Sequence, residues 1–157
     1  MERWRLLDTE TPRKASMNLA IEEAIFLAKI RGTVPPTLRF WRNERAVVLG
    51  YFQSVEAEVN LELCKRGKIQ VVRRFSGGGA VYHDLGNLNY SIAVEKDHPL
   101  LKGLDMIGTY EMLCSGVIEG LREFGLRVLF EPPSDLLIRG KKISGAAQSR
   151  KRGVIFH

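Results

Sequence analysis

Residues 73–84 read Arg73-Arg74-Phe75-Ser76-Gly77-Gly78-Gly79-Ala80-Val81-Tyr82-His83-Asp84. Three consecutive glycines give up backbone entropy and bury no side chain, so a folded chain keeps them for a reason. One reason is a tight turn or a bulge. The other is a close approach of the backbone to a ligand, with bare N–H groups available to an anion. The spacing matches neither the Walker phosphate loop nor the Rossmann glycine fingerprint, which disfavours both of those nucleotide folds.

Polar and charged side chains flank these glycines. Arg73 and Arg74 are consecutive at the end of a predicted strand, so their side chains point to opposite faces. One guanidinium group would then enter a cleft, where it suits a carboxylate or a phosphate, while the other is solvated. His83 follows the glycines, and Asn89 and Ser91 share one face of the next predicted strand. A lone histidine is more often structural than catalytic, but a histidine inside a polar cluster beside a glycine loop favours a functional site.

A second group of residues lies at 133–148 and reads Pro133-Ser134-Asp135-Leu136-Leu137-Ile138-Arg139-Gly140-Lys141-Lys142-Ile143-Ser144-Gly145-Ala146-Ala147-Gln148. Arg139 and Gly140 are expected to form the turn between the strands at 136–138 and 142–144. Gly140 and Lys141 are also typical of a hairpin turn with solvated lysines. If Lys142 begins a strand, Lys142 and Ser144 lie on one face and Ile143 on the other. The small residues that follow leave room for a ligand against the backbone. Arginine, histidine and lysine from separate strands indicate an anionic substrate rather than metal or nucleophilic chemistry.

The remaining pattern predicts an α+β fold with a mixed sheet, because strands and helices alternate without a regular βαβ rhythm. Strands are expected at 4–8, 37–41, 46–49, 69–73, 88–94, 127–130, 136–138 and 142–144. Helices are expected at 17–29, at 59–66 with a stop at Gly67, and at 109–124. The first has Ala20, Ala24 and Leu27 on its apolar face, with Ile21 and Ile25 beside them. Ser16 and Thr109 are the expected caps of the first and last of these helices.

Composition limits the class of protein. The 157 residues fit one domain, and 45% hydrophobic with 27% charged residues is typical of a soluble globular protein. No apolar run reaches the roughly 18 residues that a membrane span needs, and no secretory signal is recognisable, which predicts a cytoplasmic protein. Cys64 and Cys114 lack metal-ligand spacing and are expected to be buried free thiols.

The net charge of +6 and pI near 9.5 favour an anionic ligand or an acidic partner. Nucleic acid is disfavoured because the basic residues are dispersed and do not interleave with aromatic ones. The last residues, 154–157, have the pattern of a strand that is just beginning. We therefore expect a single domain over residues 1–157, truncated at its C-terminus.

The run at 73–87, Arg-Arg-Phe-Ser-Gly-Gly-Gly-Ala-Val-Tyr-His-Asp-Leu-Gly-Asn, resembles the signature of lipoate–protein ligases and their octanoyltransferase relatives. Lys142-Ile143-Ser144-Gly145 resembles the second motif of that family, which holds its essential lysine. Met17-Asn18 with Glu22-Glu23, and the run 38–41, are similar to further family landmarks in the same order. The resemblance implies the biotin/lipoate–protein ligase catalytic-domain fold, a mixed and mainly antiparallel sheet flanked by helices.

The resemblance also implies an activity, in which ATP activates lipoate or octanoate to an acyl-adenylate and the acyl group then passes to a lysine of an acceptor protein. Lys142 would be the catalytic residue. The residues expected to bind lipoate or acyl-AMP are Arg74, Ser76, Gly77, Gly78, Gly79, Tyr82 and His83. Those expected to bind the nucleotide are Asp84, Asn87, Asn89, Asp135, Ser144, Gly145 and Ala147. Asp135 would steady Lys142 or the nucleotide.

Cofactors and partners follow from the same resemblance. Mg²⁺ would arrive with ATP, held by the phosphates more than by the protein, and no metal site of the protein's own is expected. The acceptors would be lipoyl domains of 2-oxoacid dehydrogenase complexes or the glycine cleavage H protein. The resemblance implies that residues 1–157 are a catalytic domain without the accessory domain of the family. A separate accessory subunit is therefore a further expected partner, whereas a membrane is not expected.

Two other readings stay open. An octanoyltransferase moves the acyl group from acyl-carrier protein through a cysteine thioester and needs no ATP. In the relatives most similar to this sequence that cysteine precedes the Pro-Ser of the second motif, but residues 128–134 contain none. Cys64 and Cys114 are poor replacements because both are expected inside apolar helices. The Ala-Ala-Gln-Ser-Arg run at 146–150 does resemble the transferases. The third reading is a lipoate- or nucleotide-binding fragment that is inactive alone.

Overall fold

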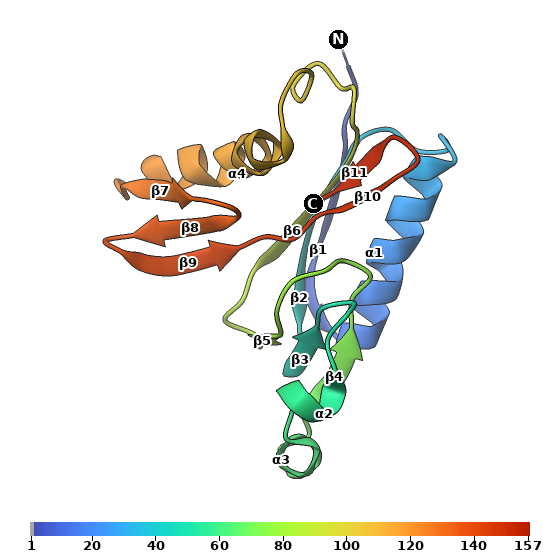
Figure 1. Ribbon diagram of the computed structural model, residues 1–157, viewed down its shortest axis with the longest axis vertical. Coiled ribbons are helices and arrows are strands. Elements are labelled where there is room, and N and C mark those ends of the chain that lie inside the picture. Colours follow the sequence, from blue (N-terminus) through green and yellow to red (C-terminus); the bar gives the residue numbers. More distant parts are fainter. Residues whose placement is uncertain (1) are drawn as a thin grey trace.

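A five-stranded sheet forms the centre of the molecule in this computed structural model, which describes residues 2–157 apart from the side chain of Glu10. Its strands lie in the order β1 (Arg5–Arg13), β2 (Thr37–Asn43), β6 (Asn89–Glu95), β11 (Val154–Phe156) and β10 (Ser149–Lys151). In this sheet, only the β1–β2 pair is parallel. Helix α1 (Ala15–Ile30) runs along one side of this sheet (Figure 1).

The buried face of α1 combines polar and apolar residues, and the apolar face expected from the sequence is only partly right. Ile25 is buried with Phe26, but Asn18, Glu22 and Lys29 are buried as well, whereas Ala20 and Ala24 are exposed. The reason lies in the sheet beneath the helix, where β2 places the fully buried guanidinium of Arg39 against α1. A buried cation needs hydrogen-bonding partners, and the polar residues of the helix supply them.

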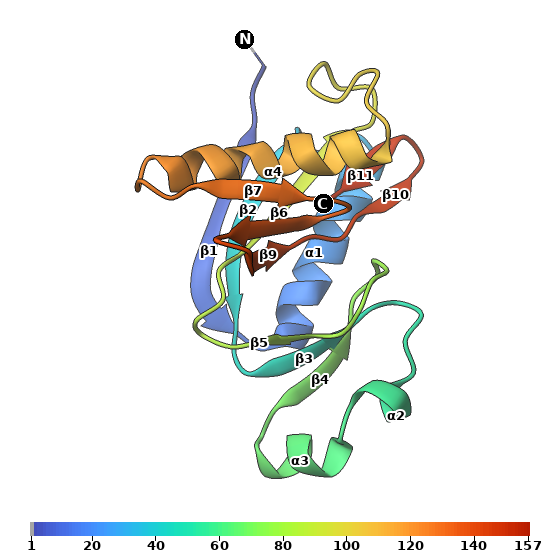
Figure 2. The same cartoon turned by 60° about the vertical axis from the view of Figure 1, so that its left-hand side comes forward.

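A second sheet has the order β4-β3-β5 and consists of β3 (Ala46–Leu49), β4 (Gln70–Arg73) and β5 (Val81–His83). The short helices α2 (Val55–Glu58) and α3 (Leu61–Arg66) connect β3 to β4, and α3 ends at Gly67 as expected. The strands predicted at 37–41 and 46–49 are confirmed, but they belong to different sheets. Figure 2 shows this second sheet below the central one, with α2 and α3 at its outer side.

A third sheet contains β7 (Val128–Glu131), β8 (Asp135–Ile138) and β9 (Lys141–Gly145), and helix α4 (Met106–Arg122) packs against it. Arg139 and Gly140 both have positive φ, at 51° and 74°, and they form the tight β8–β9 turn expected at this point. The core under this sheet is formed by Cys114 and Ile118 of α4 with Val128 and Leu136.

Several local expectations need correction. Helix α1 begins two residues earlier than expected, at Ala15, and no side chain caps it, so Ser16 is not the N-cap. Helix α4 is capped by Asp105, whose carboxylate accepts from the backbone N–H of Gly108 at 2.7 Å, and Thr109 lies within the helix. Strands β5 and β10 were not expected, because each has three residues and neither shows apolar alternation. The strand beginning at Val154 is confirmed as β11.

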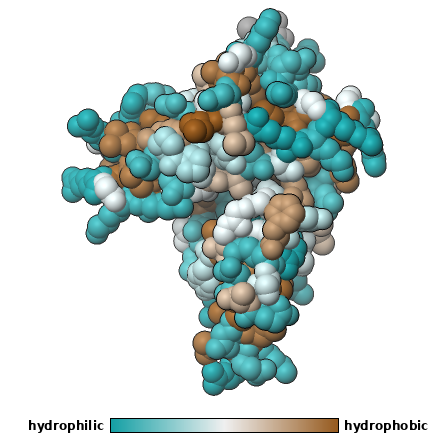
Figure 3. All heavy atoms as spheres, in the orientation of Figure 1, coloured by the Kyte–Doolittle hydropathy of each residue, from teal (hydrophilic) through white to brown (hydrophobic). Residues whose placement is uncertain are grey.

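Both cysteines are buried free thiols, as expected. No helix within residues 2–157 has the length and apolar character needed to cross a membrane. In the orientation of Figure 1, residues of intermediate hydropathy gather at the centre of the face, between the β7–β9 arm and the lower sheet. Hydrophilic residues are spread over the edges (Figure 3).

Candidate active site

A cavity of about 660 Å³ lies where the three sheets meet. It brings together residues from the two sequence motifs, which are some 60 positions apart in the chain. The expected site residues that line it are Arg74, Ser76, Gly78, Gly79, Tyr82, His83, Asn87, Asn89, Asp135, Lys142, Ser144, Gly145 and Ala147. Gly77 and Asp84 are the two expected residues that do not line it.

Arg74 anchors the glycine loop through its carbonyl groups. Its guanidinium donates to the carbonyl oxygens of Gly77 at 2.7 Å and Gly79 at 2.9 Å, and to that of Val48 at 3.2 Å. Burial lowers the pKa of Arg74. In a trans peptide the C=O and the following N–H point in opposite directions, so the N–H groups of Gly78 and Ala80 are turned away from Arg74. Neither N–H has an acceptor within residues 2–157.

Steric space distinguishes the glycines. Gly78 has φ +95°, which favours glycine, and a Cβ at this position would lie 2.8 Å from the Arg74 guanidinium. A Cβ at Gly77 or Gly79 would meet no atom within 4 Å. No neighbour in the described part of the protein therefore requires glycine at these two positions. A tight turn therefore accounts for a glycine at position 78 only. The open space beside Gly77 and Gly79 is what the close approach of a ligand to the backbone needs.

Gly50 contacts the glycine loop, which the sequence did not indicate. A Cβ on Gly50 would lie 1.9 Å from the carbonyl oxygen of Gly78 and 3.3 Å from the Arg74 guanidinium. The end of β3 therefore touches the glycine loop through a residue without a side chain. A glycine after an apolar strand is too common a pattern to have revealed this contact.

Lys142 and Asp135 form an ion pair across β8 and β9. The ammonium nitrogen lies 2.7 Å from a carboxylate oxygen, with side chains 58% and 29% exposed. A bulge at Ile143 shifts the register, so Lys142 pairs with Leu137 while Ser144 pairs with Leu136. Directly paired residues share a face, and Leu136 and Leu137 face opposite ways. The expectation that Lys142 and Ser144 share one face is therefore wrong, although both line the cavity.

The floor of the cavity is a buried polar network that the sequence did not reveal. Glu22 accepts from Arg39 at 2.6 Å and from the hydroxyl of Ser91. Ser91 in turn accepts from the indole N–H of Trp41 at 2.8 Å. Burial raises the pKa of Glu22, while the hydrogen bonds from Ser91 and Arg39 oppose that rise. Glu22, Trp41 and Ser91 all line the cavity, and the network holds the Trp41 ring in place.

His83 closes one side of the cavity. Its Nδ1 lies 3.1 Å from the amide nitrogen of Asn43, and its ring packs on Trp41 with centroids 6.1 Å apart. Burial, and to a lesser degree the charge of Arg74, lowers the pKa of His83, while Asp84 opposes the shift. The imidazole is therefore neutral at neutral pH.

A second histidine, His157, also lines the cavity and lies beside Tyr90 and Cys114. Burial lowers the pKa of His157 to about 4. Gln148 accepts from Arg150 through its carbonyl oxygen at 2.7 Å, so its amide nitrogen must donate to His157 Nδ1 at 3.2 Å. His157 then carries its proton on Nε2, which lies 3.0 Å from the Tyr90 hydroxyl. Tyr90 donates to Cys114 Sγ at 3.5 Å.

Cys114 is therefore not arranged as a nucleophile. Burial raises the pKa of its thiol, and its sulfur lies 3.9 Å from a histidine nitrogen that already carries a proton. Activation of a thiol requires a nitrogen lone pair that can take the proton. Neither Cys114 nor Cys64 lines the cavity.

Asp84 and Asn87 form a local turn. The Asp84 carboxylate accepts from the backbone N–H of Gly86 at 2.8 Å, and the Asn87 side chain accepts from the Asp84 N–H at 2.9 Å. The carboxylate of Asp84 is thus bonded within its own turn. Its expected contact with a nucleotide has no support in this arrangement.

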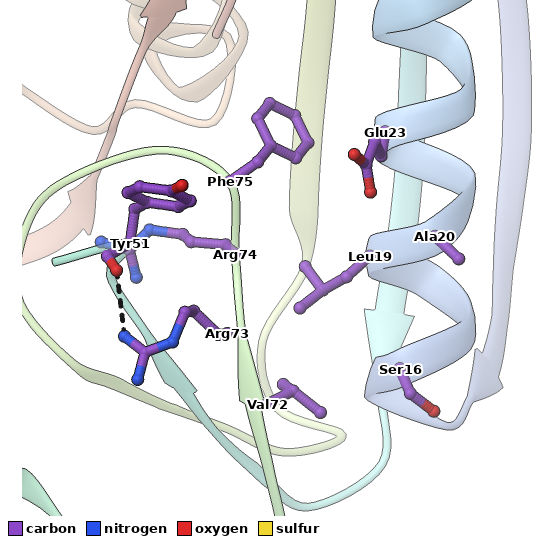
Figure 4. Close-up of a pocket in the computed structure, with 9 residues that line it drawn as sticks. All are labelled: Ser16, Leu19, Ala20, Glu23, Tyr51, Val72, Arg73, Arg74 and Phe75. Atoms are coloured by element: carbon purple, nitrogen blue, oxygen red, sulfur yellow. Dashed lines mark hydrogen bonds between the residues drawn. The ribbon is translucent and has the colours of Figure 1, made fainter. Parts of the chain in front are cut away.

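Arg73 and Arg74 point to different places, as expected from their adjacent positions. Arg73 is not merely solvated, because it donates to the carbonyl oxygens of Gly50, Tyr51 and Gln53 at 2.9, 3.1 and 2.6 Å. A shallower hollow of about 450 Å³ lies on this side. Figure 4 shows its walls, with Ser16, Leu19, Ala20 and Glu23 projecting from α1 and residues 72–75 with Tyr51 opposite them.

A comparison with models of protein families identifies the family of this chain. The model of the lipoyl protein ligase A/B catalytic domain matches residues 14–157. The chain belongs to this family. Within residues 2–157, no group of three or more histidine, cysteine, aspartate or glutamate side chains is placed to hold a metal ion.

Members of the lipoyl protein ligase A/B family resemble the chain along nearly its full length. An octanoyltransferase LipM from Halalkalibacterium halodurans is 34% identical over 180 residues, covering 99% of this chain and 64% of that protein. The lipoate-protein ligase A subunit 1 from Thermoplasma acidophilum is 38% identical over 159 residues, covering 95% of this chain and 58% of that protein. The chain thus spans less than two thirds of the length of these curated relatives.

Solved structures of the family confirm the fold. A bipartite lipoate protein ligase from Thermoplasma acidophilum, studied with its E2 lipoyl domain, superposes with a TM-score of 0.87 at 38% identity, covering 99% of this chain and 60% of that chain. A lipoate-protein ligase A bound with ATP superposes with a TM-score of 0.85 at 38% identity, covering 99% and 64%. The expected α+β fold with mainly antiparallel sheets is confirmed.

Proposed function

We propose that this chain is the catalytic domain of an ATP-dependent lipoate–protein ligase. The observation that carries the proposal is the lining of the cavity. Lys142 and the glycine loop line it, and the N–H groups of Gly78 and Ala80 in that loop have no acceptor within residues 2–157, while neither cysteine of the chain lines the cavity. A site rich in donors suits the condensation of two anions, and a thioester route would need a thiol at the same place.

The reaction proceeds in two steps. A carboxylate oxygen of lipoate attacks the α-phosphorus of ATP, the bond to the bridging oxygen breaks, and pyrophosphate leaves. The amine of an acceptor lysine then attacks the acyl carbon of lipoyl-AMP, AMP leaves with the electron pair of the acyl–oxygen bond, and the amine loses a proton. In the first step the protein brings negative groups together, so positioning and positive potential supply most of the catalysis.

The geometry of the cavity supports a role for each of several residues. Lys142 contributes an ammonium charge that Asp135 holds at 2.7 Å, and it would bind the carboxylate and α-phosphate oxygens. The N–H groups of Gly78 and Ala80 would bind a phosphate or acyl oxygen. The apolar part of the acyl chain would lie over the floor formed by Trp41, with Leu19 and Phe156 also lining the cavity.

Mg²⁺ would accompany the nucleotide. Two carboxylates line the cavity within residues 2–157, and both already bond to cations, Glu22 to Arg39 and Asp135 to Lys142. The phosphates of ATP are therefore the better ligands for the ion. Mg²⁺ would neutralise phosphate charge during adenylation.

The partners proposed are lipoyl domains of 2-oxoacid dehydrogenase complexes or the glycine cleavage H protein, together with an accessory subunit. The Thermoplasma relative is described as bipartite and as studied with an E2 lipoyl domain. The net charge of +6 suits association with an acidic acceptor domain.

Pyrophosphate release tests this proposal. Release should depend on both ATP and lipoate, with octanoate assayed beside it. Lys142→Ala should lower the rate by about a hundredfold or more, because one positioned charge at a transition state contributes that much. Lys141→Ala makes the same charge change on the neighbouring exposed residue and should retain the rate.

No pyrophosphate release, even with an accessory domain supplied, would rule out the ligase. Binding of lipoate or ATP without turnover would then indicate a binding fragment. Full activity of Lys142→Ala would remove the catalytic role of that residue. Because the Lys142 side chain is 58% exposed, loss of its ion pair should change the melting temperature little.

The second candidate is octanoyl transfer from acyl-carrier protein to a lipoyl domain. The likeness to LipM octanoyltransferases over 99% of the chain favours it. Incubation with octanoyl-acyl-carrier protein would then leave an octanoyl thioester on Cys64 or Cys114, detectable by mass spectrometry and removed by hydroxylamine. Transfer without ATP through such a thioester would replace the ligase proposal.

A further inference from the structure

A chain of hydrogen bonds leads from buried Arg39 to His83. Arg39 Nη2 lies 2.6 Å from the side-chain oxygen of Asn18. The amide nitrogen of Asn18 lies 2.7 Å from the carbonyl oxygen of Arg42 and 2.9 Å from the side-chain oxygen of Asn43. The amide nitrogen of Asn43 reaches His83 Nδ1 at 3.1 Å. Arg39, Asn18 and Asn43 are fully buried, so water does not substitute for these partners.

The donor at its first residue determines which atom donates and which accepts at every step of this series of hydrogen bonds. A guanidinium group only donates, so the Asn18 atom that faces Arg39 must be its oxygen. The nitrogen of Asn18 must then face Asn43, which requires the oxygen of Asn43 at that contact. The remaining nitrogen of Asn43 is a donor without a lone pair. His83 Nδ1 therefore has to accept, and the proton of the neutral ring lies on Nε2.

The surroundings of His83 favour the same state. Its ring lines the cavity, and Arg74 is the cation that lowers its pKa together with burial, whereas Asp84 opposes this. A protonated ring would direct an Nδ1–H at the amide hydrogens of Asn43, with no acceptor between them. On the far side of the ring, Nε2 has no partner within residues 2–157.

We infer that Asn43 is a positioning residue that holds His83 as a neutral Nε2–H donor facing the cavity. The identity of the accepting oxygen, on the acyl carboxylate or the α-phosphate, rests on the proposed function. In this state Nε2 has no lone pair, so His83 is not the base that takes the proton from the acceptor lysine. The Nε2–H of His83 is instead a fourth hydrogen-bond donor at the cavity, beside the ammonium group of Lys142 and the N–H groups of Gly78 and Ala80.

Nitrogen-15 NMR of the histidine side chains tests the inference without any substrate. The chain has three histidines, which keeps the spectrum simple. His98 is an internal reference, because its Nδ1 accepts from the backbone N–H of Leu100 at 3.2 Å and so requires the same tautomer. At pH 7, His83 should show a protonated Nε2 and an unprotonated Nδ1. A protonated Nδ1 in the unaltered protein overturns the inference.

Asn43→Asp reverses the donor, because a carboxylate can only accept. His83 should then move its proton to Nδ1 and gain a higher pKa. The rate of pyrophosphate release should fall about 10- to 100-fold and acquire a pH dependence between pH 6 and 8, since a misplaced proton removes one donor. Asn60→Asp is the matched control, because Asn60 caps α3 through its side-chain oxygen and Asp caps equally well.

The two proposals fail separately. The expected tautomer with no pyrophosphate release leaves the Asn43 inference standing and removes the ligase. Lipoate-dependent pyrophosphate release together with a proton on Nδ1 of His83 supports the ligase and overturns the Asn43 inference. If Asn43→Asp does not fold, the spectrum of the unaltered protein still decides the question. An unchanged tautomer in a folded Asn43→Asp protein also overturns the inference.

Discussion

At the residue scale, the contacts that shape the site are made by backbone atoms as well as by side chains. The guanidinium of Arg74 donates to carbonyl oxygens of the glycine loop. Gly50 lies against the same loop, with no room for a side chain between them. Lys142 is the residue whose charge faces the cavity with one partner, Asp135. The glycine loop thus has its carbonyls directed to the protein and its N–H groups free for a ligand.

Gly50→Ala should displace the glycine loop. The added methyl group would stand 1.9 Å from the carbonyl oxygen of Gly78, and backbone on both sides limits relaxation. We expect the free energy of unfolding to fall by about 1–3 kcal/mol, as in other overpacked sites. Chemical denaturation measures this.

Gly79→Ala is the control for that measurement, since its Cβ would meet nothing within 4 Å. It should leave the free energy of unfolding within about 0.5 kcal/mol of the unaltered protein. Equal stability of both variants would contradict the tight contact between Gly50 and the loop.

At the element scale, the short end of β4 and the loop after it behave as one unit because Arg74 joins them. Helix α1 shows the complementary case, in which a buried face is built of polar residues around Arg39. The β8–β9 hairpin then carries Asp135 and Lys142 to the cavity from a separate sheet. Each element thus supplies one side of the site, and none forms it alone.

Arg74→Met should loosen the glycine loop even without a ligand. Methionine keeps much of the length but leaves the carbonyl oxygens of Gly77, Gly79 and Val48 without their donor. Hydrogen bonds from a charged group contribute about 1.5–3 kcal/mol, so a loss of about 2 kcal/mol in unfolding free energy is expected. Faster amide hydrogen exchange at residues 76–80 should accompany it.

Arg122→Met serves as the reference for this change, because Arg122 is exposed and pairs with Glu119 on the surface of α4. It should alter unfolding by less than about 1 kcal/mol. If Arg74→Met kept full stability and lost only ligand affinity, Arg74 would be a ligand contact and not an anchor of the loop.

At the scale of the whole molecule, buried histidines couple stability to pH. The pKa of His157 is about 4 in the folded protein because of burial, against about 6.5 when unfolded. Between these values the unfolded chain binds more protons, so stability is lost as pH falls from about 6.5 to 4. The lowered pKa of His83 acts in the same direction, whereas the raised pKa of Glu22 acts in the opposite one.

His157→Gln should therefore flatten the pH dependence. A shift from about 6.5 to about 4 corresponds to roughly 3 kcal/mol. The difference in unfolding free energy between pH 7 and pH 4 should shrink by an amount of that order in the variant. Denaturation at a series of pH values measures this. An unchanged slope would show that His157 does not resist protonation in the folded state.

Much of this organisation was predictable from the sequence because it depends on near neighbours. Alternation identified most strands, Gly67 ended α3, and the Arg139–Gly140 turn joined β8 to β9 where expected. The two motifs also indicated the family and most of the residues that line the cavity. The caps of α1 and α4 were misjudged, because hydroxyl side chains near a helix start resemble a cap without forming one.

The sequence alone determined the family, the α+β class and the two groups of polar residues, since each is written in a continuous run of the chain. Only the tertiary structure decided which partner each polar group has. Arg39 meets Asn18, Asn43 meets His83 and Gly50 meets Gly78 across separations of 21, 40 and 28 residues. Periodicity carries no information at such distances. Those contacts determine where the glycine loop directs its N–H groups and which nitrogen of His83 carries a proton.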